Sequence, residues 1–356
     1  MRRSALWLLL CAAVVALWTV WPPPAAWLDR VYGGVVYPAI AAVLVPLTGA
    51  FDLPVAALVI AGLLLWLALS LVFSKRTGRS AVWLAFWRTL VGTATLAALF
   101  VVLWGANYGR TPVETRLTLS AGTTPEPLET AAIAEALADI LRENADAPEV
   151  WDADLTAART ALQRVTGRLE GRPATLPRHV KRTPPGFLIA TGGATGLTVP
   201  WTLEAYVDRA LPYPAALATA LHEYVHLAGY AGEAEADFVA ALAGLSAESA
   251  SLRYATALPL FLRAAGTLPP ERYRTLFGSL PARTQADVAE LGDAYRRYRA
   301  PRVVARVQTL AYDGYLKSQR VDAGVADYDR VTVLLVAAVR DGVLGFTGDR
   351  ATLTLP

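Results

Sequence analysis

The sequence contains very little cysteine and histidine. Among its 356 residues there are one cysteine and three histidines. The cysteine, Cys11, lies within an apolar run, so no disulfide can form inside the chain, and cysteine usage says nothing about the redox compartment. The rest of the chain therefore lacks a cysteine for a zinc site or for a thiol nucleophile.

Charged residues are also scarce. They make up 18% of the chain, whereas hydrophobic residues make up 54%, a departure from soluble proteins in the direction of membrane proteins. The formal net charge of +3 comes from scattered arginines, without an aromatic-interleaved basic patch or a nucleic-acid-binding motif. We therefore expect a lipid bilayer as a partner and no nucleic acid.

Three long apolar stretches predict transmembrane helices. They cover residues 5–21, 53–73 and 81–105, and each has about the length that crosses a bilayer as a helix. The sequence thus predicts a three-helix membrane region over residues 1–105.

Two neighbouring segments leave alternatives open. Residues 35–50 are apolar but contain Pro38 and Pro46, which favours a membrane-surface or re-entrant segment over a fourth span. The first apolar stretch could also be a cleaved signal peptide, because prolines and alanines follow it. Trp18 and Trp21 at its end are typical of a membrane interface and favour a retained span.

Basic residues in the short loops predict the topology. Arg2 and Arg3 precede the first stretch, and residues 75–79 between the second and third include three basic side chains. The positive-inside rule places both in the cytoplasm, and the loop 22–52, with a single arginine, outside. The prediction is a multi-pass protein of the inner (plasma) membrane with residues 106–356 as an extracytoplasmic domain. Cleavage of the first stretch would not change this orientation.

The outer domain is predicted to be mainly helical with a small β element. Two short strands are expected at 187–191 and 197–207, separated by the glycine-rich turn 192–196. The proline- and arginine-rich segment 171–186 is expected to be a solvated loop, with contact to anionic lipid as an alternative. Apolar residues at helical spacing predict helices at 128–144, 152–169, 249–264, 283–299, 302–317 and 327–340. Two further helices are expected, one from Pro214 to about Leu227 and one from near Glu233 to beyond Ala243.

One motif indicates a reaction: the run His222-Glu223-Tyr224-Val225-His226. On a helix, two histidines four residues apart share a face, and both can bind one metal ion. The alternative is two histidines on a solvated or buried helix face without a metal. Two of only three histidines occur in this motif, which favours the metal site.

The third metal ligand must come from another segment. A catalytic zinc usually has three protein ligands and keeps one position open. Gly229 is expected to end the motif helix, and the acidic residues Glu233, Glu235 and Asp237 follow. Glu233 and Asp237 share a helix face, whereas Glu235 points about 200° away from Glu233. This spacing predicts Glu233 as the ligand and Asp237 as the support of a ligand histidine, with Glu235 as the alternative third ligand.

Glu223 is expected to be the general base. Zinc lowers the pKa of a bound water, from which a neighbouring carboxylate can take a proton. An oxyanion formed from the substrate would need a further donor, and Tyr230, Arg253, Tyr254 and His179 are candidates. Each of these four is more typical of a structural role.

The acidic residues after the motif resemble those of the gluzincin class of zinc metallopeptidases. The resemblance implies His222, His226 and Glu233 as ligands, Glu223 as the base and Asp237 as the supporting acid. The chain departs from familiar gluzincins because only residues 227–232 separate the second histidine from the glutamate, where most members have a longer insertion.

A second resemblance covers nearly the whole chain. The sequence is similar to a family of bacterial inner-membrane proteins of unknown function with three N-terminal spans. Members usually carry Asn at the position of Asp237. The resemblance supports the membrane topology and a zinc site and implies no substrate. It is carried by residues 104–110, 222–236, 252–255, 312–317 and 324–328.

Together these features predict a membrane-anchored zinc metallopeptidase that binds one Zn²⁺ per chain and cleaves an extracytoplasmic protein or peptide. The strand at 197–207 could pair with an extended substrate or could be an ordinary edge strand. The alternatives are a zinc-stabilised sensor or scaffold without turnover and an amidase that acts on cell-wall peptides. Glu223 argues against the scaffold, because a structural zinc site has no need of a base and usually closes its fourth position.

Overall fold

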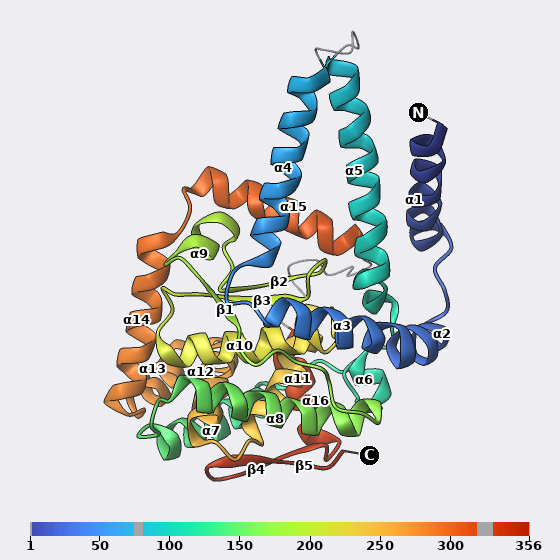
Figure 1. The fold of residues 1–356 in the computed structure, drawn as a ribbon. Coiled ribbons are helices and arrows are strands. Elements are labelled where there is room, and N and C mark those ends of the chain that lie inside the picture. The colour runs from blue at the N-terminus through green and yellow to red at the C-terminus, as the bar shows by residue number, and fades with distance from the viewer. Residues whose placement is uncertain (1, 75–80, 319–329, 356) are drawn as a thin grey trace. The chain divides into compact units, whose positions relative to one another are not determined.

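The computed structural model describes residues 2–74, 81–318 and 330–355 (Figure 1). The chain divides into two compact units. The first, called the apolar unit here, comprises Met1–Arg110 and Val199–Glu204. The second, called the helical unit, comprises Thr111–Thr198 and Ala205–Pro356.

The apolar unit consists of helices. Its first helix packs along its last: the Trp7 indole donates a hydrogen bond to Thr95 Oγ1 at 2.8 Å, and the Trp87 indole donates to Ser4 Oγ at 3.1 Å. The elements are α1 (Arg2–Val20), α2 (Ala25–Trp27), the π-helix η1 (Leu28–Val36), α3 (Tyr37–Gly49), α4 (Val55–Ser74), α5 (Ala81–Leu103) and the 3₁₀-helix η3 (Gly105–Gly109).

Three helical runs in the described part of the chain are long and apolar enough to cross a membrane: Arg3–Val20, Ala25–Gly49 and Trp83–Leu103. The first and third correspond to predicted spans, and the second predicted span forms α4, whose described apolar part is the shorter Val55–Leu69. These helices indicate a membrane protein. The predicted cytoplasmic loop 75–79 lies outside the described residues.

The prolines do not interrupt residues 35–50 as the sequence suggested. Pro38 lies where the π-helix η1 passes directly into α3, and Pro46 lies within α3. The resulting run Ala25–Gly49 is long enough to span a bilayer. Within the apolar unit, α3 runs crosswise to α4 and α5 (Figure 1).

The segment Val199–Glu204 joins β2 to β3 but clusters with the apolar unit. The Glu204 carboxylate accepts the backbone N–H groups of Val55 at 2.9 Å and Ala56 at 2.7 Å. An acid at this position satisfies donors that the first turn of α4 leaves free and interacts favourably with the helix dipole. The Trp201 indole donates to the Leu96 carbonyl at 2.9 Å. The chain therefore enters the helical unit, returns to the apolar unit at this loop, and leaves it again.

The helical unit is mainly α-helical with short strands, as predicted. Its first sheet has the order β1-β3-β2, with β1 parallel to β3, and its second is the antiparallel pair β4–β5. Its elements are α6 (Val113–Arg116), α7 (Pro127–Asn144), α8 (Trp151–Glu170), β1 (Lys181–Thr183), α9 (Phe187–Gly192), β2 (Gly196–Val199), β3 (Glu204–Asp208), α10 (Tyr213–Leu227), α11 (Glu233–Leu245), α12 (Ala250–Gly266), α13 (Pro270–Gly278), α14 (Ala282–Tyr298), α15 (Arg302–Ser318), α16 (Arg330–Arg340), β4 (Leu344–Thr347) and β5 (Arg350–Leu353).

The core of the helical unit forms around α12, which contacts α7, α10 and α11. Tyr224, Phe238 and Phe261, on α10, α11 and α12, are fully buried there. At Gly244 of α11 a Cβ atom would overlap the side chain of Thr256, so glycine permits the close approach of α11 and α12. This packing holds α10 and α11 against each other in the interior.

The predicted strand at 187–191 is wrong, because these residues form the short helix α9. The Asp208 carboxylate accepts the backbone N–H groups of Gly186 at 2.6 Å and Leu188 at 2.8 Å. Asp208, which is distant in sequence, thus binds backbone N–H groups that the start of α9 leaves free. A pattern within residues 187–191 could not indicate this contact. The glycine-rich segment 192–196 consequently connects α9 to β2 and is not a hairpin turn.

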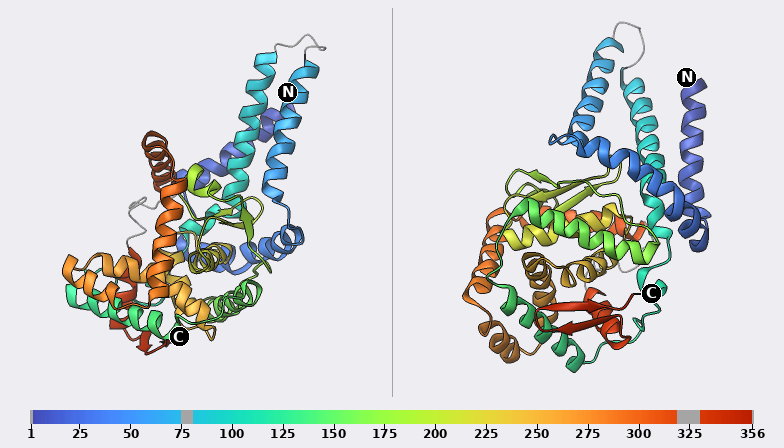
Figure 2. Two further views of the ribbon diagram at one scale, coloured as in Figure 1. Left: turned by 90° about the vertical axis from the view of Figure 1, so that its left-hand side faces the viewer. Right: turned by 60° about the horizontal axis from the view of Figure 1, so that its bottom comes forward.

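The predicted strand at 197–207 is two strands, β2 and β3, with a turn between them. The predicted loop 171–186 contains β1, which pairs with β3 through Lys181 opposite Tyr206. The sequence also missed α13 and the hairpin β4–β5, which Figure 2 shows from a second side.

Candidate metal site

The motif lies on α10, a helix whose ends follow from its sequence. Proline occupies its first turn, where a missing N–H costs no helical bond. The helix ends at Leu227, and Gly229 adopts φ +96°, a conformation that glycine tolerates best. The chain turns and begins α11 at Glu233. Both helices agree with the predicted ones, and the turn brings the first residues of α11 back to the motif.

Three of the predicted residues converge. Glu233 Oε2 lies 3.2 Å from His222 Nε2 and 3.4 Å from His226 Nε2. One ligand atom from each of His222, His226 and Glu233 lies within 4.8 Å of the other two. The two imidazole rings are nearly perpendicular, with centroids 4.7 Å apart. The three side chains thus present two nitrogens and one oxygen to a common point.

The second nitrogen of each ring is occupied. His222 Nδ1 lies 2.7 Å from Asp237 Oδ1, and His226 Nδ1 lies 2.8 Å from the carbonyl oxygen of Tyr230. A carbonyl oxygen only accepts, so His226 donates from Nδ1 when it is neutral, and its Nε2 lone pair faces the common point. Asp237 fixes His222 in the same way and also binds Arg263. The sequence had indicated Asp237, whereas Arg263 and the Tyr230 carbonyl carried no recognisable signal.

Glu235, the alternative third ligand, points elsewhere. Its carboxylate accepts the backbone N–H of Val113 at 2.8 Å and lies 3.3 Å from Arg116 Nη2. Glu233 is 6% exposed and lies at the histidines. The 200° separation of the two acids on α11 places them in different environments, and Glu233 is the one with the geometry of a ligand.

Glu223 is buried beside the three converging residues, with 5% of its surface exposed. Its Oε2 accepts a hydrogen bond from the Thr198 hydroxyl of β2 at 2.7 Å. A Cβ atom at Gly196 would lie 2.3 Å from Glu223 Oε1, so the start of β2 approaches the carboxylate as closely as a residue without a side chain allows. The sequence had indicated Glu223 but neither Thr198 nor Gly196.

Burial and charge shift the pKa values of this cluster in the metal-free protein. Burial raises the pKa of Glu223, and the neighbouring histidines oppose that shift only in part. Burial would also raise the pKa of Glu233, but the two histidines hold it well below its usual range. Burial lowers the pKa of His222, but Asp237 and Glu233 outweigh it and raise the pKa well above the usual value. The carboxylates therefore favour positive charge at this point, whether it comes from protons or from a cation.

The candidate oxyanion donors are mostly engaged in other contacts. Arg253 binds the Asp349 carbonyl and carboxylate, and the Tyr254 hydroxyl donates to an aspartate of α14 at 2.6 Å. His179 is exposed and lies 3.7 Å from a carboxylate at the start of α8. Tyr230 contributes its carbonyl to the site, while Arg116 covers its ring.

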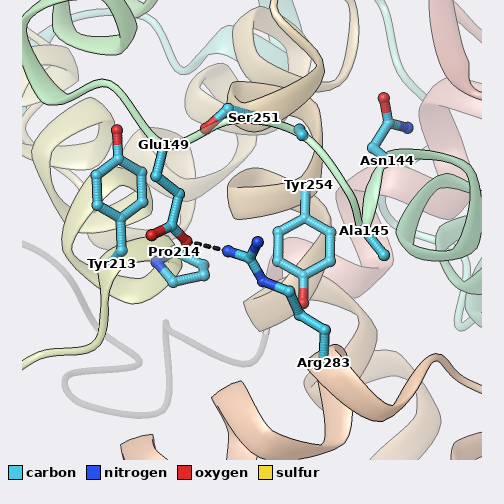
Figure 3. Close-up of a pocket in the computed structure, with 9 residues that line it drawn as sticks. Asn144, Ala145, Glu149, Tyr213, Pro214, Ser251, Tyr254 and Arg283 are labelled. Carbon is cyan, nitrogen blue, oxygen red and sulfur yellow. Dashed lines mark hydrogen bonds and ion pairs between the residues drawn. The ribbon is translucent and has the colours of Figure 1, made fainter.

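A separate small pocket carries none of the motif residues (Figure 3). It has room for about one water molecule, and an ion pair between Glu149 and Arg283 crosses it (Figure 3). It is too small for a peptide or a cofactor. Its lining residues are Asn144, Ala145, Ala147, Glu149, Tyr213, Pro214, Ser251, Tyr254 and Arg283.

Comparison with known proteins assigns the family and no activity. No curated protein and no solved structure matched the chain. The family described as Protein of unknown function (DUF3810) matches residues 32–336, a range that includes the converging histidines. The match covers well over half of the sequence and agrees with the apolar N-terminal helices expected of such a membrane family. The chain belongs to this family.

Proposed function

We propose that the chain is a membrane-anchored zinc metallopeptidase of the zincin type, with one Zn²⁺ held by His222, His226 and Glu233. The observation that supports this proposal most directly is the convergence of their Nε2 and carboxylate atoms while both Nδ1 atoms are occupied. Two histidines and one glutamate form a known catalytic zinc set, and such sites keep one position for water or substrate.

The surrounding groups fit the same metal. Ligand histidines in zinc sites usually donate their second N–H to a carboxylate or a carbonyl, which fixes the ring and raises its basicity. Asp237 and the Tyr230 carbonyl make these two kinds of contact. Two neutral imidazoles and one carboxylate would leave a dipositive ion with net positive charge.

Glu223 would act as the proton carrier. Bound zinc supplies Lewis acidity, which lowers the pKa of a coordinated water and polarises a substrate carbonyl. Glu223 then accepts a proton from water and passes it to the departing amine of the cleaved bond. In the metal-free protein its burial raises its pKa. The Thr198 hydroxyl holds one of its oxygens in place.

The position of β2 supports a peptide as the substrate. β2 is an edge strand of the three-stranded sheet, and it carries the residue that holds Glu223. An extended peptide can add to such an edge through main-chain hydrogen bonds. A chain bound in this way would pass beside Glu223. The sequence predicts a single strand at 197–207 for this pairing. In the structure the edge strand is β2 (Gly196–Val199), which covers the start of that range.

A zinc-stabilised sensor or scaffold and an amidase for cell-wall peptides are the rival functions. The scaffold is disfavoured because Glu223 is buried beside the ligands, is held by Thr198 and is not among the three converging residues. The amidase would use the same residues on a different amide, so only substrates distinguish it.

We further propose that the helical unit lies outside the cytoplasm at the inner membrane, as the basic loops indicate. In a Cys11→Ser background, Arg274→Cys on α13 should react with a membrane-impermeant maleimide in intact spheroplasts. Thr77→Cys, in the predicted inner loop, should react only after lysis. The opposite pattern would place the helical unit in the cytoplasm.

Glu223→Gln tests the reaction. The amide keeps the shape of the side chain but cannot act as a base, so zinc should remain bound while cleavage falls by about 10²–10⁴-fold. Zinc is measured by mass spectrometry on purified full-length protein, and cleavage with a library of quenched fluorescent peptides and cell-wall peptides. Unchanged turnover of any substrate found would contradict the mechanism, and activity on cell-wall amides alone would favour the amidase.

Glu233→Ala and Glu235→Ala form a matched pair for the third ligand. Glu233→Ala removes a converging oxygen, so zinc affinity should fall beyond the 10–100-fold typical of supporting residues. Glu235→Ala loses contacts to Val113 and Arg116 and removes no atom from the converging group, so the zinc affinity of this variant should stay within about threefold of wild type. Competition with a zinc chelator measures both. Loss of zinc in Glu235→Ala alone would reverse the ligand assignment.

Gly196→Ala tests the contact between β2 and Glu223. The new methyl group would overlap the carboxylate, so kcat should fall at least about tenfold, because misplacement of a catalytic group is costly. Zinc content should remain unchanged. Gly192→Ala is the control, because its Cβ would meet nothing closer than 4.0 Å. Equal activity of the two variants would show that the approach of β2 to Glu223 has no catalytic role.

A further inference from the structure

Helix α15 exposes an apolar stripe. Val303, Val307 and Leu310 are 77%, 61% and 64% exposed, and Val304 beside them is 45% exposed. The positions i, i+4 and i+7 share one face of a helix, so these side chains form a continuous stripe. Four large, exposed hydrophobic side chains thus lie together on α15. Single exposed hydrophobic side chains are common on protein surfaces, but a contiguous group indicates an interaction site.

Arginines border this stripe. Arg302 and Arg306 lie on α15 at one edge of it, and both are exposed. Including the end of α14, five arginines occur between Asp293 and Asp313, and no acidic residue lies between these two aspartates. The first three turns of α15 therefore combine an apolar face with positive charge on its border.

α15 contacts α9 of the helical unit through a residue outside the apolar stripe. Gln308 lies outside the apolar stripe, and its amide donates hydrogen bonds to the carbonyl oxygens of Ala190 and Thr191 of α9. α15 follows α14 and lies at the end of the helical unit opposite the β4–β5 hairpin (Figures 1 and 2). The contact with α9 orients the helix while the stripe remains exposed.

We propose that α15 binds the surface of an anionic lipid bilayer, with its valines and leucine among the acyl chains and its arginines at the phosphate groups. An amphipathic helix with basic residues beside an apolar face is suited to this position. Anionic headgroups attract each nearby arginine. The helical unit begins only one residue after Arg110, which closes the first segment of an apolar unit whose helices can span a membrane. The chain therefore tethers the helical unit to a bilayer, and this proposal does not depend on zinc, on peptidase activity or on the side of the membrane on which the helical unit lies.

The test uses full-length protein in lipid nanodiscs. In a Cys11→Ser background, Val307→Cys and Thr309→Cys are each labelled with an environment-sensitive fluorophore. Position 309 is also exposed but lies about 200° around the helix from 307. In nanodiscs containing phosphatidylglycerol, the label at 307 should emit at shorter wavelength. Lipids with a nitroxide on the acyl chain should quench it at least about twofold more than the label at 309.

Further measurements separate the bilayer from other occupants. Arg302→Gln with Arg306→Gln, or nanodiscs of phosphatidylcholine alone, should reduce the quenching at 307, because the anionic attraction is lost. Emission at 307 as solvent-exposed as at 309 would overturn the proposal. So would a blue-shifted label at 307 that lipid nitroxides do not quench, because it would show that protein, either this chain or a second copy, covers the stripe.

Discussion

The arrangement of the site depends on two carboxylates one helical turn apart on α11. Glu233 faces the Nε2 atoms of both motif histidines, and Asp237 binds the Nδ1 atom of His222. Neither acid is adjacent to the histidines in sequence, so the turn at Gly229 and the packing of α10 and α11 on α12 are needed to bring them there. Two buried carboxylates so close together destabilise the folded state unless positively charged groups compensate for their lost hydration. The interior of the helical unit is therefore built to hold positive charge at one point.

The position of Glu223 depends on a different element. Thr198 and Gly196 lie on β2, an edge strand that local sequence patterns merged into a longer strand. The missing side chain at Gly196 leaves space for the carboxylate, and the Thr198 hydroxyl binds it. α10 thus carries both motif histidines and Glu223, while the groups that hold their side chains come from different elements: Asp237 of α11 binds His222, and Thr198 of β2 binds Glu223.

Features with a local cause were predictable from the sequence. Helical periodicity predicts α7, α8, α12, α14 and α15, and i, i+4 spacing places Glu233 and Glu235 on different helix faces, as the structure has them. The errors have long-range causes. The helix α9 starts with the help of Asp208, and β1 exists because it pairs with β3. Arg263 binds Asp237 from another helix, so its role could not be inferred from spacing within either segment.

The chain passes between the two units three times: after Arg110, after Thr198 and after Glu204. Thr198, which holds Glu223, belongs to the helical unit, whereas the following residue, Val199, belongs to the apolar unit. Five residues later, Glu204 binds the first turn of α4. Removal of residues 1–110 would leave this buried carboxylate without its backbone donors, at a cost of about 1–3 kcal/mol or more for a charged group. The penalty would fall on the loop between β2 and β3. The start of α4 therefore holds the loop that joins β2 to β3, so the first turn of α4 is part of the native surroundings of this loop.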